Sequence, residues 1–191
     1  RQQHSVTLRF ALDASSAVAK CRELAQKYLP LRGTWWVDDE LYLRLAGSEA
    51  AVQESAARLG GEQLHDSALW QNVTDHGADF FKLATPVNSE RQASTLWRIV
   101  LPPAAPLPEA DPSCLAVEWG GGQRWLWHTD SDYVHGYARQ HKGWAWALGQ
   151  AVILDPIQAR YMRAVKAAFD PDDMFVSALD LGAQEGGERA D

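Results

Sequence analysis

The sequence predicts an α+β fold in which an antiparallel sheet carries helices packed on one face. Three observations support this prediction: short alternating segments that indicate strands, amphipathic segments that indicate helices, and one order of elements that recurs in both halves of the chain. The order strand, helix, strand, strand, helix is typical of the ferredoxin-like, or split βαβ, arrangement. We therefore expect a duplicated ferredoxin-like sheet, with pseudo-repeats at about 5–61 and 94–149.

The first half supplies a strand, a helix, a hairpin and a second helix. Its opening strand alternates apolar and polar residues, and Asp13 or Ser15 can cap the helix that follows. Asp38 and Asp39 form the expected turn of the hairpin, and Ser48 is the expected cap of the second helix. The expected elements are a strand (6–12), a helix (13–29), a hairpin (34–47) and a helix (48–61).

The second half repeats this order, except that a proline-rich segment takes the place of its first helix. Prolines at this density cannot sustain a helix, because proline lacks the amide hydrogen and clashes with the preceding turn. Glycines 120–122 form the expected turn of the hairpin, and Thr129 or Asp130 caps the helix after it. The expected elements are a strand (94–102), the proline-rich segment (103–112), a hairpin (114–129), a helix (131–142) and a strand (144–148).

Two further helices complete the expected fold, one between the halves (67–81) and one after the second half (156–171). All these elements form a single expected domain, 1–181, and the glycine-rich, charged tail at 182–191 is expected to be disordered. The chain opens with RQQHSVTLRF, without an initiating methionine or a signal sequence. We therefore expect it to be a piece of a longer protein.

Composition argues against several classes of function. The chain has 18 Lys and Arg against 25 Asp and Glu, a formal net charge of -7, which argues against a nucleic-acid binder. No apolar run approaches the ~20 residues that a membrane span requires. The two cysteines, Cys21 and Cys114, are too few for a disulfide framework and lack metal-ligand spacing. Reduced thiols in the cytoplasm are therefore expected.

Strand alternation predicts a basic face on this acidic protein. The apolar residues of the expected strands fall on one side, including Trp125, Trp127, Trp144 and Trp146. The opposite side is expected to carry Arg9, Arg44, Arg98, Arg124 and His128. This face is either a solvated surface or a surface that meets another domain or an anionic ligand, because guanidinium groups suit carboxylates and phosphates.

No motif predicts a self-sufficient active site. His128, His135 and His141 lack the spacing of a closed metal site, and no nucleophile elbow is present, so neither a metal nor a catalytic residue is predicted. The glycines at 120–122 join two strands and do not open a helix, so they are not a nucleotide loop. Most of the nine tryptophans are expected in the core, although a carbohydrate platform would need several of them on the surface.

Four stretches resemble a known family in their order and spacing. They are LYLRLAGSEAAVQESAARLGGE (41–62), LWRIVLPPAAP (96–106), VEWGGGQRWL (117–126) and VKAAFDPDDMF (165–175). They resemble the C-terminal cap region of the FAD-linked oxidase family, and within it the FAD-binding subunit of bacterial glycolate oxidase. The resemblance implies a cap with a ferredoxin-like sheet over the flavin, whose FAD is held mainly by a separate N-terminal domain.

The closing motif of the family, F-D-P-x-x-x-F-N-P-G, is only partly kept. Phe169, Asp170, Pro171 and Phe175 match it, whereas Val176, Ser177 and Ala178 replace the Asn, Pro and Gly. The terminal stretch approaches the flavin in the family, so this departure argues against direct cofactor contact here. We expect no tight FAD binding by this chain alone.

The resemblance implies one step of chemistry, the oxidation of a 2-hydroxy acid, glycolate, to glyoxylate with FAD as the electron acceptor. It also implies partners, namely the flavin and iron–sulfur subunits of a glycolate oxidase complex, in the cytoplasm or peripheral at the inner membrane. The chain alone is then expected to be inactive, and its arginine-bearing face would turn to the flavin domain or to an anionic group. Two alternatives are a non-catalytic subunit-assembly module and a carbohydrate-binding module.

Overall fold

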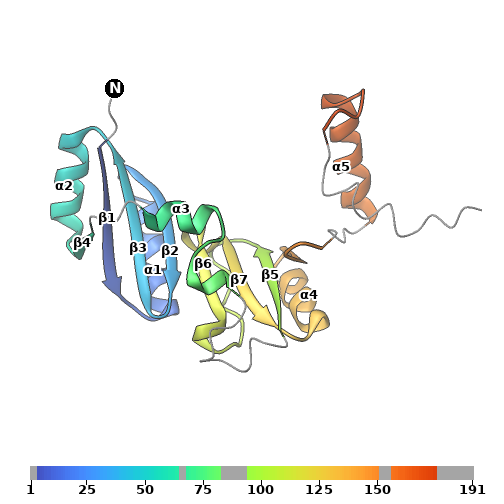
Figure 1. Cartoon of the computed structure of the whole chain (residues 1–191), viewed down its shortest axis with the longest axis horizontal. Coiled ribbons are helices and arrows are strands. Elements are labelled where there is room, and N and C mark those ends of the chain that lie inside the picture. Colours follow the sequence, from blue (N-terminus) through green and yellow to red (C-terminus); the bar gives the residue numbers. More distant parts are fainter. Residues whose placement is uncertain (1–3, 65–67, 83–93, 151–155, 176–191) are drawn as a thin grey trace, which may run out of the picture. The chain divides into compact units, whose positions relative to one another are not determined.

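The computed structural model describes residues 4–64, 68–82, 94–150 and 156–175. The chain divides into two compact units, residues 1–145 and residues 146–191, and each unit is a separate body. Within the described residues, eight strands form one sheet in the order β4-β1-β3-β2-β6-β7-β5-β8 (Figure 1). The expected α+β class with an antiparallel sheet is confirmed.

The first half of the sheet has the strand order β4-β1-β3-β2. Asp38 and Asp39 form the tight turn between β2 and β3, and both have a positive φ, 48° and 58°, as this hairpin turn requires. The expected turn and the expected cap at Ser48 are confirmed. The elements are β1 (His4–Ala11), α1 (Ala14–Ala25), β2 (Leu31–Val37), β3 (Glu40–Gly47), α2 (Glu49–Leu59) and β4 (Glu62–Leu64).

The second half has the order β6-β7-β5-β8, which mirrors the first half across the β2–β6 junction. Asp130 caps α4 by accepting hydrogen bonds from the amides of Asp132 and Tyr133, which confirms one of its two expected caps. This mirrored order is compatible with the expected pseudo-repeats, and the duplication itself stays a prediction. The elements are β5 (Thr95–Val100), η3 (Pro112–Cys114), β6 (Leu115–Glu118), η4 (Trp119–Gly121), β7 (Gln123–His128), α4 (Ser131–Gln140) and β8 (Trp144–Ala147).

The sheet has a helix face and an arginine face. The helix face packs against α1, α2 and α4, and its buried side chains include Leu8, Leu43 and Ile99. The arginine face carries Arg9 and Arg98, and α3 (Ala68–Thr74) and the short helix η1 (Asp79–Phe81) lie on it. In Figure 1, α3 lies in front of the sheet and α1 behind it.

A second core therefore lies on the arginine face. Because direct antiparallel partners lie on the same side of a sheet, the register puts Trp35, Ala116 and Trp125 together there. Phe80 and Phe81 of η1 pack against these residues, and Trp35 and Phe80 are in edge-to-face contact with ring centroids 6.1 Å apart. Trp70 of α3 donates a hydrogen bond to the hydroxyl of Thr7 at 2.8 Å.

The predicted phase of β7 was wrong. Arg124 pairs with Val117 and Ile99, so Arg124 and His128 belong to the helix face. Trp125 and Trp127 instead lie on the arginine face, in the second core. Both faces of β7 are buried, so alternation between polar and apolar residues could not show which face was which.

Several expected boundaries also shift. α1 ends at Ala25, and Tyr28, which the helical pattern included, is fully exposed. The helix expected at 67–81 is broken into α3 and η1, with His76 at a positive φ of 53° between them. Trp144 was expected in the core but is 45% exposed. In the second unit, α5 (Pro156–Phe169) confirms the expected final helix, and the expected tail at 182–191 lies outside the described residues.

Candidate functional site

Three of the five site residues expected from the sequence share the arginine face. Arg9 and Arg44 lie on neighbouring strands, and the register of β5 places Arg98 on the same side. Arg124 and His128 were wrongly assigned to this face, because the register of β7 places them on the helix face. The candidate site is therefore the arginine face without Arg124 and His128.

Arg9 is held between two carboxylates. Its guanidinium donates to Glu40 at 3.0 Å and to Glu62, so two acidic groups neutralise one cation. These carboxylates raise the pKa of Arg9. Glu40 also accepts a hydrogen bond from Tyr42, and burial together with this carboxylate raises the pKa of Tyr42 to about 12. Arg9 thus ties β1 to β3 and β4.

Arg44 is more exposed, and its Nε donates to the hydroxyl of Ser5 over a long 3.5 Å. It lies on β3, directly opposite Thr7 of β1. A long hydrogen bond between exposed groups contributes little to stability. Arg44 is therefore a cation that the fold holds loosely.

Arg98 lies in an aromatic setting. Its guanidinium carbon is 5.6 Å from the ring centroid of Trp119 and 5.5 Å from that of Trp125, within the range of cation–π attraction. Its Nε donates to the side-chain oxygen of Gln123 at 2.7 Å. Burial lowers the pKa of Arg98, and the charge of Glu118 opposes this shift.

Gln123 and Glu118 continue this polar network. Gln123 is buried, accepts from Arg98 and donates to the carboxylate of Glu118. The same carboxylate accepts from the indole nitrogen of Trp125 at 2.7 Å. A half-buried guanidinium is thus fixed from one side by a buried amide and lies against two indoles, which is an arrangement suited to a carboxylate ligand.

Arg124 has a different role from the one expected. It is fully buried on the helix face, and it donates to the carbonyl oxygens of Ala105 at 2.6 Å and of Pro106. It also donates to the hydroxyl of Tyr137 on α4. Burial lowers the pKa of Arg124. Arg124 therefore holds the proline-rich segment in place from the helix face.

The histidines weighed as metal ligands have aromatic neighbours instead. The ring of His128 stacks on Tyr133 with centroids 4.7 Å apart, and its Nδ1 accepts from the amide of Asp130. His135 contacts Trp97, and His141 contacts Tyr137. Among the residues that the structure describes, no group of three His, Cys, Asp or Glu side chains could hold a metal ion.

His76 is a residue that the sequence analysis missed. Its ring contacts Trp125 and Phe81, with centroids 4.9 Å and 4.8 Å apart, so it lies on the arginine face next to the ring that Arg98 contacts. The sequence showed no sign of this position, because His76 lies between α3 and η1, in a stretch that the periodicity assigned to one continuous helix.

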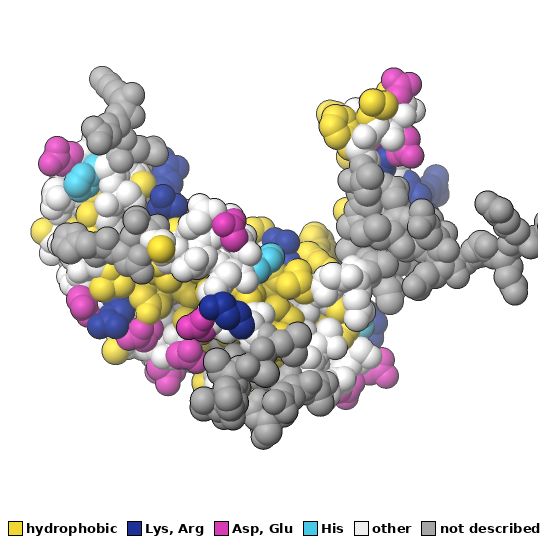
Figure 2. Space-filling model, in the orientation of Figure 1, with side chains coloured by type: hydrophobic (Ala, Val, Ile, Leu, Met, Phe, Trp, Pro, Cys, Tyr) yellow, Lys and Arg dark blue, Asp and Glu magenta, His cyan; other side chains and the backbone are white. Residues whose placement is uncertain are grey.

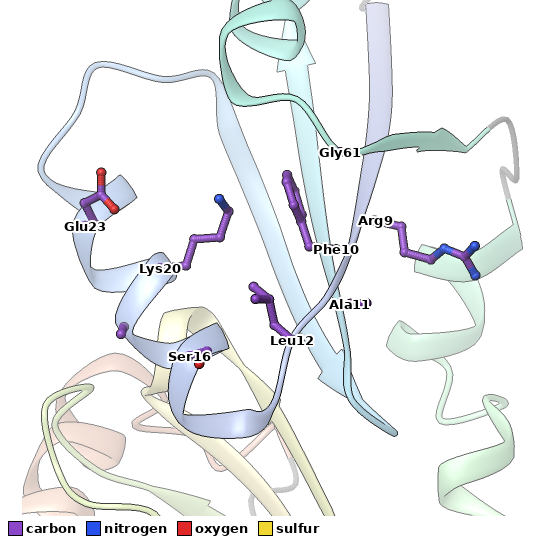
Figure 3. Close-up of a pocket in the computed structure, with 9 residues that line it drawn as sticks. Arg9, Phe10, Ala11, Leu12, Ser16, Lys20, Glu23 and Gly61 are labelled. Atoms are coloured by element: carbon purple, nitrogen blue, oxygen red, sulfur yellow. The ribbon is translucent and has the colours of Figure 1, made fainter.

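A groove of about 660 Å³ lies on the other side of β1, between this strand and α1. Figure 3 shows Lys20 and Phe10 on the groove side of β1, with the side chain of Arg9 pointing away. The ammonium of Lys20 is 4.3 Å from the ring centroid of Phe10. Its lining is mixed, because Ser16, Lys20 and Glu23 lie beside apolar residues.

The family motif forms a local structure after α5. The carboxylate of Asp170 accepts from the amides of Met174 at 2.7 Å and Phe175 at 3.0 Å and also binds the ammonium of Lys166. These amides lower the pKa of Asp170. Asp170 thereby closes the turn that Pro171 begins, whereas Val176, Ser177 and Ala178 lie outside the described residues.

The glycine-rich turn at η4 does not have the architecture of a phosphate-binding loop. The glycine-rich turn at η4 joins β6 to β7 and is followed by a strand, whereas phosphate loops open a helix. Among the residues that the structure describes, no helix is both long and apolar enough to cross a membrane. The glycine turn therefore serves the hairpin, as expected.

Comparison with known proteins identifies one relative. No protein-family model and no solved structure matches the chain. The glycolate oxidase subunit GlcE of Escherichia coli (strain K12) is 32% identical over 181 residues, which are 92% of this chain and 48% of the relative. The chain thus spans about half the length of that relative. The resemblance inferred from the sequence is confirmed, and the chain is related to a bacterial glycolate oxidase subunit.

Proposed function

We propose that this chain is the substrate-side, cap-like part of a flavin-dependent 2-hydroxy-acid oxidase subunit. The observation that carries the proposal is the similarity to the glycolate oxidase subunit over nearly the whole chain. The substrate class is a short 2-hydroxy acid such as glycolate. The expected single domain at 1–181 would be this part, and the FAD would be held by another part of the subunit.

The arginine face supports this proposal. A 2-hydroxy acid carries one carboxylate, and a guanidinium binds a carboxylate through paired hydrogen bonds. Arg98 supports this role, because Gln123 fixes its orientation and the rings of Trp119 and Trp125 lie beside its guanidinium. Arg9 is engaged by Glu40 and Glu62, so its part is to hold the sheet.

Figure 2 shows the side of the sheet on which α3 lies. Hydrophobic side chains gather over its middle, and charged side chains border them. Such a surface is suited to contact with another protein part, because exposed apolar area is buried on association. We propose that this face meets the flavin-holding part, within a complex that includes flavin and iron–sulfur subunits.

The test uses the full-length subunit in its complex. We expect a flavin spectrum that glycolate bleaches, and we expect loss of this reduction when residues 1–191 are removed. Arg98→Ala is expected to raise KM for glycolate at least tenfold, since a charged hydrogen-bond partner contributes about 1.5–3 kcal/mol. Arg58→Ala, on the exposed surface of α2, is the matched control and should leave KM unchanged.

Two results would count against the proposal. Flavin reduction by glycolate that continues at the same rate without residues 1–191 would remove this chain from the substrate side. A complex that falls apart on removal of the chain, while Arg98→Ala has normal kinetics, would favour the subunit-assembly role instead.

The carbohydrate-binding alternative has little support from the tryptophans. All nine are among the described residues, and five are buried: Trp35, Trp36, Trp97, Trp125 and Trp127. Only Trp119 and Trp144 are clearly exposed. A sugar platform needs several exposed rings on one surface, so this alternative is not taken further.

A further inference from the structure

We draw no further inference here: the strongest candidate, the exposed apolar stripe that Ile157, Tyr161, Val165 and Phe169 form along α5, carries none, because nothing in the structure shows what covers it.

Discussion

The guanidinium of Arg124 and the phenol of Tyr137 hydrogen-bond to each other in the core, and both donate to the carbonyl oxygen of Pro106. Arg124 also donates to the carbonyl oxygen of Ala105 at 2.6 Å. These bonds attach the proline-rich segment to β7 and α4. Proline lacks an amide hydrogen, so a proline-rich segment forms few backbone hydrogen bonds of its own, and these side-chain donors help to fix it in place.

Removal of the Arg124 guanidinium should therefore loosen the proline-rich segment. Arg124→Met is expected to lower the free energy of unfolding by about 2 kcal/mol, because the half-buried carbonyl of Ala105 loses its charged donor. Tyr137→Phe is expected to lower it by about 1 kcal/mol, since Pro106 keeps Arg124 as a donor. Urea unfolding measures both effects. The double variant should show coupling, and strictly additive losses would contradict a shared cluster.

Gly136 lies inside α4 and Gly143 lies after its end, and replacement of each by alanine should change stability with opposite signs. Gly136 lies inside the helix with open space at its Cβ position, so Gly136→Ala is expected to stabilise the protein by about 0.5–1 kcal/mol. A Cβ atom on Gly143 would overlap the carbonyl oxygen of Val100 and the side chain of Leu101. Gly143→Ala is therefore expected to destabilise by about 2 kcal/mol. Equal melting temperatures for both variants would refute the close approach at Gly143.

Tyr42 should make stability fall at alkaline pH. Its pKa is raised to about 12 by burial and by Glu40, so the folded protein keeps the phenolic proton where the unfolded chain, near 10, has lost it. A raised pKa contributes stability that is fully present below the unfolded value and is lost as pH rises through about 10 to 12. Tyr42→Phe should remove this part of the pH dependence. A slope identical to that of the wild type would show that Tyr42 is not protected.

The two thiols should be inert in the folded protein. Cys21 and Cys114 are both buried, and burial raises the pKa of Cys21 to about 11. The thiolate is the reactive form, so Cys21 should react with a disulfide reagent at pH 8 only on unfolding. Labelling counted by mass spectrometry before and after urea tests this expectation. Rapid labelling of Cys21 without denaturant would mean that α1 opens readily.

The sequence predicted the helices, strands and turns better than it predicted on which side of the sheet each residue lies. The hairpin turn at Asp38–Asp39 and the cap at Asp130 carry local chemistry, and the structure confirms both. The face of Arg124 could not be predicted from alternation, because α4 covers one side of β7 and η1 covers the other. Where both sides of a strand are buried, polar and apolar residues no longer mark outside and inside.

In the candidate site, too, some residues could be predicted from the sequence and others could not. Arg98 was found by alternation on its own strand, where Ile99 marks the buried side. Trp119 and His76 were missed, because their importance comes from positive φ values and from ring contacts across the chain. Contacts between distant segments carry no periodic signal.

The proline-rich segment has a consequence for how this chain can change. Its carbonyls and the Arg124 guanidinium satisfy each other, so neither can be replaced alone. A helix at 103–110 would bond its own carbonyls and leave the buried Arg124 with the Tyr137 hydroxyl in place of its backbone acceptors. The loss of Arg124 would in turn leave the loop without its main donor. The proline-rich segment and Arg124 should therefore be conserved together, so that related chains have both or neither.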